Sequence, residues 1–306
     1  MCYSAQIWAD YRKYQKTFGA DLDIAAFVEL YWARQNGAKA KTPKAMDDAL
    51  LDSEAGEMIH AFRGSQAMKL EQEMFAQTKR LNDAERALQT KTTKAATESK
   101  RIATDKISKA KLGLEDLRRT ESKPRDSRIF PGVYAPVLVM ENGKRVIKPM
   151  RYQCRPAGKP AKNDILYPGT YNARRDSLEK YWKELFGYSH GLMVVSTFYE
   201  NVEGPDGKNQ VLQFTPKDGG DMLVACLWSE WTDPAGKDPA LLSFAAITDD
   251  PEPEVAAAGH DRTIINIKPE HVDAWLNPDA ENLAALYAIF DDKQHPFYEH
   301  RLEKAA

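Results

Sequence analysis

Hydrophobic residues in the first part of the chain recur with the period of a helix. Between Asp21 and Gln35, apolar side chains return at steps of three and four residues, and Asp21 or Asp23 can cap the first turn. This pattern predicts one helix over residues 21–35. A second, short helix is predicted over Ala45–Phe62.

Two longer apolar series follow between about Gln66 and Thr120, and each alternates steps of four and three, as in helices that pack along a seam. The series are Leu70, Met74, Gln77, Leu81, Ala84 and Leu88, and then Ala103, Ile107, Ala110, Leu114 and Leu117. Between them lies a Thr-rich stretch, residues 89–99, and Thr is a weak helix former. We expect a helical hairpin or a long bent helix, with the Thr-rich stretch as its tip or weak point.

After Pro124 the pattern changes to short apolar runs separated by Gly, Pro and polar residues. Val133–Met140 and Arg145–Ile147 flank Asn142-Gly143, a dipeptide that favours the tight turn of a β-hairpin. Further strands are expected at Leu192–Tyr199, Val211–Thr215, Met222–Trp228, Leu242–Thr248 and Thr263–Ile267, and helices at Ser177–Phe186, Pro269–Leu276 and Ala280–Phe290. The fold class is therefore α+β, with a mostly antiparallel β core and flanking helices.

The composition shift suggests how the chain is divided. We expect residues 1–40 and 125–306 to form the core, and residues 41–124 to be an inserted, charged helical segment. Basic side chains outnumber acidic ones along much of this insertion. Such a charge run is typical of a solvated helix face, and a phosphate-contacting face is the alternative. The partner of the insertion is unknown.

The composition also limits the class of protein. With 306 residues, 42% of them hydrophobic and 29% charged, the chain can bury a full core and is typical of a soluble globular protein. It has no apolar run of roughly 18 residues, which predicts no membrane span, and no secretory signal pattern. Three cysteines without C-x-x-C spacing indicate a reducing compartment, hence a cytoplasmic protein, and argue against a cysteine-built zinc site.

Position 2 carries a candidate nucleophile. If Met1 is removed, Cys2 presents an amine and a thiol on adjacent carbons. The amine can condense with an aldehyde, and the thiol can then close on the imine to give a thiazolidine ring. Reference pKa values of about 7.7–8.0 for the amine and about 8.5 for the thiol leave both partly reactive near neutral pH. Taken alone, an arbitrary residue at a frayed terminus explains Cys2 better.

Four further segments line up with Cys2 along the chain, and a fifth, Ala274-Trp275-Leu276, follows them. The four are Tyr171-Asn172-Ala173-Arg174, Phe198-Tyr199-Glu200, Leu227-Trp228-Ser229-Glu230-Trp231 and His260-Asp261-Arg262. Their order resembles the SOS response-associated peptidase (SRAP) family, which combines an N-terminal Met-Cys with Asn-Ala-Arg, Phe-Tyr-Glu, Leu-Trp-Glu-x-Trp-like and His-x-Arg motifs. The resemblance covers residues 1 to about 36 and about 130 to 280.

The resemblance implies a function in the DNA damage response. SRAP proteins bind single-stranded DNA and DNA junctions, and their N-terminal Cys forms a thiazolidine crosslink with the aldehyde of an abasic site. Removal of the protein's own Met1 is attributed to the family as a peptidase-like step. The partner expected for this chain is single-stranded DNA with abasic sites, with nucleoid association when bound, and no metal or cofactor is required.

The resemblance also implies a role for each motif residue. Cys2 corresponds to the nucleophile, and Asn172 to an amide that holds the terminus and the sugar oxygen. Glu200 and His260 correspond to groups that move protons during imine formation. Arg174 corresponds to a phosphate clamp. Each of these residues alone has an ordinary explanation as a turn, strand-end, loop or surface residue, and only their joint order favours the functional one.

Expected DNA contacts extend beyond Arg174. Arg151, Tyr152 and Arg155 are further candidates, because basic residues interleaved with aromatic ones suit a single-strand groove. Arg262 is another, because it matches the Arg of the family's His-x-Arg motif. The family usually follows Met-Cys with Gly-Arg, where this chain has Tyr3 and Ser4. A phosphate-contacting Arg next to the terminus is therefore missing.

Two other functions stay open from the sequence. One is an N-terminal-nucleophile hydrolase, an amidase or peptidase in which the Cys2 amine serves as base. The other is a non-catalytic DNA- or protein-binding module that uses the helical insertion. Turnover of amide substrates without DNA would favour the first, and loss of DNA binding on deletion of the insertion would favour the second.

Overall fold

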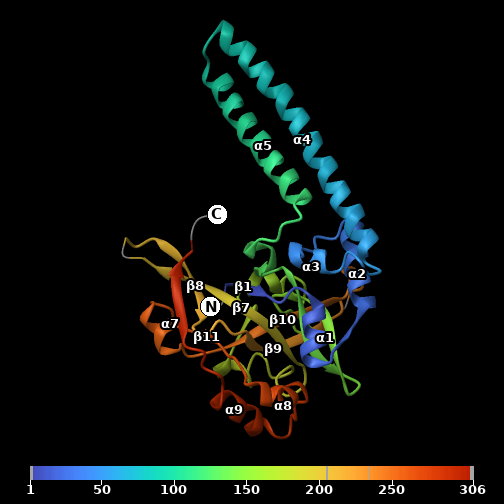
Figure 1. The fold of residues 1–306 in the computed structure, drawn as a ribbon, viewed down its shortest axis with the longest axis vertical. Helices are drawn as coiled ribbons and strands as arrows, with labels where there is room; N and C mark the ends of the chain where they lie inside the picture. The colour runs from blue at the N-terminus through green and yellow to red at the C-terminus, as the bar shows by residue number, and fades with distance from the viewer. Residues whose placement is uncertain (1–2, 205, 234, 304–306) are drawn as a thin grey trace. The chain divides into compact units, whose positions relative to one another are not determined.

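The structure is a computed structural model that describes residues 3–204, 206–233 and 235–303 (Figure 1). Contacts divide the described chain into two units. The sheet unit contains the residues up to Leu30, Lys39–Leu50 and those from Lys123 onward. The hairpin unit contains Tyr31–Ala38 and Leu51–Ser122. No helix of the described residues has the length and apolarity needed to cross a membrane.

The sheet unit is built on one sheet of twelve strands within the described residues. The strands are β1 (Ser4–Ile7), β2 (Asp21–Leu22), β3 (Arg128–Ile129), β4 (Tyr134–Glu141), β5 (Lys144–Tyr152), β6 (Asn172–Arg174), β7 (His190–Glu203), β8 (Asn209–Pro216), β9 (Met222–Trp231), β10 (Leu241–Asp249), β11 (Thr263–Ile264) and β12 (Tyr298–Leu302). All pairs are antiparallel except those of β5 with β10 and β2, and of β6 with β10. The expected α+β class with a mostly antiparallel sheet is confirmed.

The central strands close on themselves. β4 pairs with β5, β5 with β10, β10 with β9, β9 with β7, and β7 returns to β4. Closure removes exposed strand edges. Val137, Ile147 and Phe244, from three of these strands, are fully buried. The predicted β4–β5 turn is confirmed, because Asn142 (φ 51°) and Gly143 (φ 74°) both adopt the left-handed conformation that this turn needs.

β7 is long enough to serve two sets of neighbours. Its first half, His190–Val195, pairs with β9. Its second half pairs with β1 on one side, where Ser4 faces Tyr199, and with β8 on the other, where Glu200 faces Leu212. This second half carries the Phe-Tyr-Glu segment into a position next to the N-terminal strand.

Helices of the sheet unit are short and lie along the chain between strands. They are α1 (Tyr11–Phe18), α3 (Lys44–Ala49), α6 (Asn163–Leu166), α7 (Pro253–Ala257), α8 (Val272–Leu276) and α9 (Leu283–Asp291), with 3-10 turns η1 (Pro124–Ser127), η2 (Arg175–Ser177) and η3 (Pro269–His271). α2 (Ile24–Gln35) begins in this unit, and the side chain of Asp23 accepts a hydrogen bond from the Ala26 N–H, the cap expected from the sequence.

Two predicted helices are wrong in detail. The helix expected over 45–62 ends at Ala49, because a turn over 50–55, in which the Gly56 N–H donates to the Ser53 carbonyl, separates α3 from the next helix. The helix expected over 177–186 is a series of turns. Its apolar residues Leu178, Trp182 and Phe186 are buried as the spacing predicts, but its main-chain hydrogen bonds span unequal lengths and form no regular helix.

The hairpin unit contains two long helices, α4 (Gly56–Thr90) and α5 (Lys94–Arg118), which run side by side in opposite directions (Figure 1). Thr93 caps α5 by accepting a hydrogen bond from the Ala96 N–H at 3.2 Å. The predicted seams meet, since Gln77 and Ala84 of α4 and Ala103, Ala110 and Leu114 of α5 are buried. The helical hairpin is therefore confirmed, and the single bent helix is excluded.

Candidate active site

Glu200 and His260 form a buried pair in the sheet unit. Glu200 lies in the second half of β7 with its side chain 1% exposed, and His260 follows α7 with its side chain 8% exposed. The Nε2 atom of His260 lies 3.3 Å from the Oε2 atom of Glu200. The structure thus brings together two of the residues that the sequence assigned to proton transfer, although 59 positions separate them in the chain.

The loop after α7 fixes the orientation of His260. Its backbone N–H donates to the Val255 carbonyl at 3.2 Å, and Gly259 turns the chain with φ 91°, a conformation that favours glycine. The Nδ1 atom of His260 lies 3.0 Å from the Arg262 carbonyl oxygen. With the ring proton on Nδ1, this N–H donates to the carbonyl, and Nε2 is left as an acceptor facing Glu200.

Burial sets the charge state of the pair. It raises the pKa of Glu200 to about 8, since a buried carboxylate loses its hydration, and a hydrogen bond from the Tyr3 backbone opposes this rise only in part. Burial also lowers the pKa of His260. Near neutral pH the arrangement is therefore a protonated carboxyl facing a neutral imidazole, a pair that can donate a proton and take one back.

The N-terminal strand runs directly beside Glu200. The Tyr3 N–H donates to the Tyr199 carbonyl at 3.3 Å, and Ser4 is fully buried opposite Tyr199. Cys2, the predicted nucleophile, and Met1 lie outside the described residues.

Arg128 is a residue of this region that sequence reasoning missed. Its Nε and Nη2 atoms donate to the Ser4 hydroxyl at 3.1 and 2.9 Å, its guanidinium lies 3.7 Å from the centroid of the Tyr199 ring, and it forms an ion pair with Glu303. These contacts hold β1 against β7. No local sequence pattern predicts these contacts of Arg128, because the two-residue strand that carries Arg128 pairs with β1 across more than 120 positions.

Asn172 and Arg174 lie on β6. One strand, β10, separates β6 from β11, which follows the His260-Asp261-Arg262 segment. β6 pairs with β10 so that Arg174 faces Thr248, and β11 pairs with the same residue from the other side. Asn172 is buried, and its Oδ1 accepts a hydrogen bond from the Tyr152 hydroxyl at 3.4 Å. Arg174 is more exposed, with its side chain 40% accessible, and its Nε lies 3.2 Å from Asp176. Arg174 is thus open to a ligand.

The other predicted DNA contacts are differently placed. Tyr152 is fully buried, stacked on Phe244, so its ring offers no open face for a base. Arg151 and Arg155 both bind Asp164, through Nη1 at 2.8 Å and Nε at 3.0 Å. A DNA contact by either guanidinium would require this ion-pair cluster to open.

Arg262 contacts His260 through its main chain. Its carbonyl and its N–H both contact His260 Nδ1, and its Nη2 pairs with Asp261 at 3.3 Å. Within the described residues its Nε is buried without a hydrogen-bond partner. An unsatisfied guanidinium N–H costs free energy when buried, so this group is a donor available to an anion or a sugar oxygen.

Two tryptophans of the remaining motif segments are buried in the core. Trp231 is fully buried and donates to the Lys159 carbonyl, and Trp275 is fully buried and donates to the Gly191 carbonyl at 2.8 Å. The rings of His190 and Trp275 lie 3.8 Å apart between centroids and are tilted by 30°, and burial lowers the pKa of His190 to about 3, so it stays neutral. The thiols of Cys154 and Cys226 are buried, and burial raises both pKa values, that of Cys154 to about 12. Neither thiol is placed to react.

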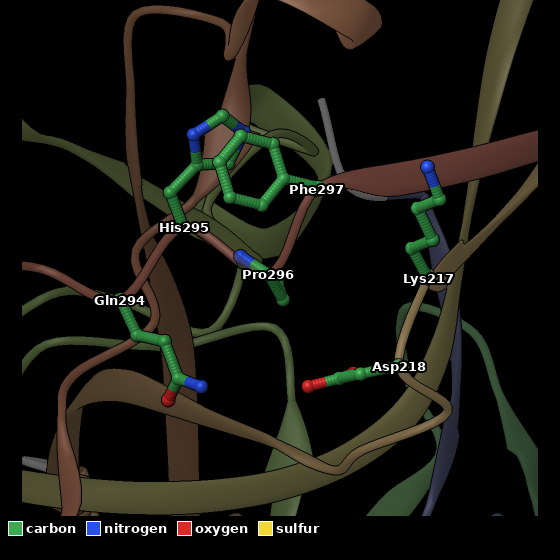
Figure 2. Close-up of a pocket in the computed structure, with 6 residues that line it drawn as sticks. All are labelled: Lys217, Asp218, Gln294, His295, Pro296 and Phe297. Atoms are coloured by element: carbon green, nitrogen blue, oxygen red, sulfur yellow. The ribbon is translucent and has the colours of Figure 1, made fainter.

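Two cavities lie elsewhere on the sheet unit. One, of about 810 Å³, is lined by Arg174 together with Thr248 and both acidic and basic neighbours. Another, of about 520 Å³, contains none of the predicted site residues (Figure 2). Figure 2 shows the rings of His295 and Phe297 on one side of it, and Lys217 and Asp218 on the other. Among the described residues no group of three or more His, Cys, Asp or Glu side chains is arranged to hold a metal ion.

Comparison with solved structures finds similar folds at low sequence identity. A protein from Bordetella bronchiseptica is 18% identical with a TM-score of 0.47, covering 61% of this chain and 90% of its own. A protein from Bacteroides thetaiotaomicron is 14% identical with a TM-score of 0.48, covering 58% and 78%. A phage-related protein from Bordetella bronchiseptica is 19% identical with a TM-score of 0.44, covering 61% and 85%. No curated protein matches the chain significantly.

A family model decides the relationship. The model described as SOS response associated peptidase (SRAP) matches residues 85–303, which is more than two thirds of the 306 residues. The match contains Asn172, Glu200 and His260, and Cys2 precedes it. The resemblance seen in the sequence is confirmed: the chain belongs to the SOS response associated peptidase family, which associates it with the response to DNA damage.

Proposed function

We propose that the protein captures abasic sites in single-stranded DNA by forming a thiazolidine between Cys2 and the deoxyribose aldehyde. One observation carries the proposal above all. The buried Glu200–His260 pair, with a carboxyl whose pKa is raised to about 8, lies beside the main chain of Tyr3, the residue that follows Cys2. A proton donor is thereby held next to the residue that follows the nucleophile in the sequence.

The chemistry that this pair would support is balanced without a cofactor. The Cys2 amine attacks the aldehyde carbon to give a carbinolamine. The Glu200 carboxyl donates its proton to the departing hydroxyl, which leaves as water, and an iminium forms. The Cys2 thiolate then bonds to the iminium carbon, and the thiol proton passes to the Glu200 carboxylate. The net reaction joins protein and DNA and releases one water.

His260 and the neighbouring side chains serve this sequence in supporting roles. The acceptor Nε2 of neutral His260 holds the Glu200 proton in place and can receive it transiently. Arg174, with its side chain 40% accessible, is the expected contact for a phosphate next to the lesion. Asn172 and the Nε of Arg262, which has no hydrogen-bond partner among the described residues, are the expected contacts for the sugar oxygens.

An intact-mass measurement tests the proposal. The mature protein, lacking Met1, is incubated with a single-stranded oligonucleotide whose one uracil has been excised. We expect a denaturation-resistant adduct with the summed mass of both molecules less one water. Cys2→Ala should form none, whereas Cys226→Ala, which removes a buried thiol, should form it at the normal rate.

Two outcomes would overturn the proposal. One is the same adduct from Cys2→Ala, and the other is no adduct from wild-type protein shown to lack Met1. Turnover of peptide or amide substrates without DNA, lost in Cys2→Ala, would instead assign Cys2 to a hydrolase.

A further inference from the structure

α4 carries an exposed stripe on the side facing away from α5. Phe75 is 78% exposed and Met68 is 58% exposed. Phe75 lies two residues from the buried Gln77, a rotation of about 200° around the helix, so it points away from the seam. Two large apolar side chains this exposed, about two helical turns apart on one face, are characteristic of a contact surface.

The stripe is symmetric about its own midpoint. Its exposed members are Glu57, Ala61, Gly64 and Met68, followed by Phe75, Lys79, Asn82 and Arg86. The spacing is four, three, four in both halves, mirrored about a point between Glu71 and Gln72. A helix with such a stripe is self-complementary when a second copy of it is laid antiparallel across a two-fold axis at that point.

We propose that α4 pairs with α4 of a second copy of this chain along this stripe, in antiparallel register. Met68 of each copy then contacts Phe75 of the other, a sulfur–aromatic contact made twice. Glu57 of each copy faces Arg86 of the other. Ala61 faces Asn82, and Lys79 faces Gly64, so no stripe residue meets a like charge. This complementarity of charge and shape identifies a second copy as the occupant.

Gly64 supports the close approach of another helix. Glycine weakens the interior of a helix relative to alanine, yet Gly64 lies in α4 at an exposed position. A Cβ atom built there would meet nothing within 4 Å, so no contact among the described residues requires glycine. In the proposed pair the missing side chain makes room for the stem of Lys79 from the second copy.

Sedimentation or light scattering over a range of concentrations tests the pairing on the full chain. Wild-type protein should dimerise, and Phe75→Glu should abolish the dimer. Leu112→Glu is the matched control, because Leu112 is 61% exposed on α5, outside the stripe. Unchanged helicity by circular dichroism will show that each variant is folded.

A charge swap tests the register. Glu57→Arg or Arg86→Glu alone should weaken the dimer about tenfold or more, because each substitution places like charges together at two symmetric sites. The double variant E57R/R86E restores opposite charges and should return the dissociation constant to within about threefold of wild type. A monomer at every concentration, a dimer insensitive to Phe75→Glu, or a double variant without recovery would each overturn the proposal.

Discussion

The two units depart from ordinary burial in opposite ways. The sheet unit buries a carboxyl group, that of Glu200, to 1% exposure. The hairpin unit exposes a phenylalanine, Phe75, to 78%. Both are unfavourable choices for a monomer that only has to fold, since charged groups are normally solvated and large apolar ones buried. The difference agrees with the two proposals made above, a dry site for chemistry in the sheet unit and contact with a second copy of the chain in the hairpin unit.

If this division is right, the crosslinking chemistry should depend on the sheet unit and not on the hairpin unit. Glu200→Gln keeps the shape of the side chain and removes its titrating proton. We expect the rate of adduct formation with abasic single-stranded DNA to fall by about 100-fold or more, the usual contribution of a general acid. The rate is measured by quenching with denaturant and resolving the adduct by mass or on a gel.

The matched change in the other unit is excision of residues 51–122 in favour of a short Gly-Ser linker. The ends can be joined because α3 and η1, which flank the excised segment, are in contact within the sheet unit. The shortened protein should crosslink at close to the normal rate and should be monomeric. A large loss of rate on excision, or a normal rate in Glu200→Gln, would contradict the division of labour.

Phe198 in the sheet unit and Phe75 in the hairpin unit should differ in how much each contributes to the free energy of unfolding. Phe198 is fully buried and stacked on Phe214 with ring centroids 5.0 Å apart. Phe198→Ala should lower the free energy of unfolding by about 3–5 kcal/mol, because a cavity replaces the ring. Phe75→Ala should change it by less than about 0.5 kcal/mol at a concentration where the chain is monomeric. Urea denaturation of both variants measures the two values, and equal losses would contradict the assigned exposures.

The same contrast explains what the sequence could predict. The α4–α5 seam depends on residues alternately four and three apart, such as Gln77, Leu81 and Ala84, so its period is visible in the chain and the hairpin was correctly expected. The site depends on Tyr3, Glu200 and His260, which three distant segments bring together. Motif order named Glu200 and His260, but only the three-dimensional structure shows that their side chains lie 3.3 Å apart.

Other parts of the site had no signal in the sequence at all. Arg128 reaches Ser4 through a two-residue strand, and its role follows from pairing alone. Tyr152 has the composition of a stacking residue, yet the closure of β5 against β10 buries it. The helix expected over 177–186 failed for a related reason, since tertiary burial of its apolar residues is satisfied by a series of turns.

A titration separates the buried carboxyl from an exposed one. Between pH 4.5 and about 8 the folded protein keeps the Glu200 proton that the unfolded chain releases, so the free energy of unfolding falls as pH rises through this window. Glu200→Gln lacks this effect and should gain stability relative to wild type from pH 5 to pH 8. Burial lowers the pKa of His260, which makes stability rise with pH at the acidic end and opposes the Glu200 effect there.

The control for the titration lies in the hairpin unit. Glu73 forms an ion pair with Lys106 at 3.0 Å, with its side chain 43% exposed. Glu73→Gln should change the free energy of unfolding by only a small amount, because an exposed ion pair contributes little to stability. Urea unfolding at the two pH values provides the comparison. A pH-independent difference between Glu200→Gln and wild type would contradict the assigned burial of this proton.

The smallest expected effect distinguishes the two faces of the hairpin itself. Gly64→Ala meets open space, so it should stabilise α4 by about 1 kcal/mol, the difference in helix propensity. At Gly113 a Cβ would lie 3.1 Å from the Cδ1 of Leu70, so Gly113→Ala forces this side chain to shift and should gain less. Hydrogen exchange of α4 and α5 amides at low protein concentration measures both. Because the added methyl of Gly64→Ala also lies where a second α4 would approach, a variant that is more helical yet dimerises more weakly would separate the stability of the hairpin from its proposed contact.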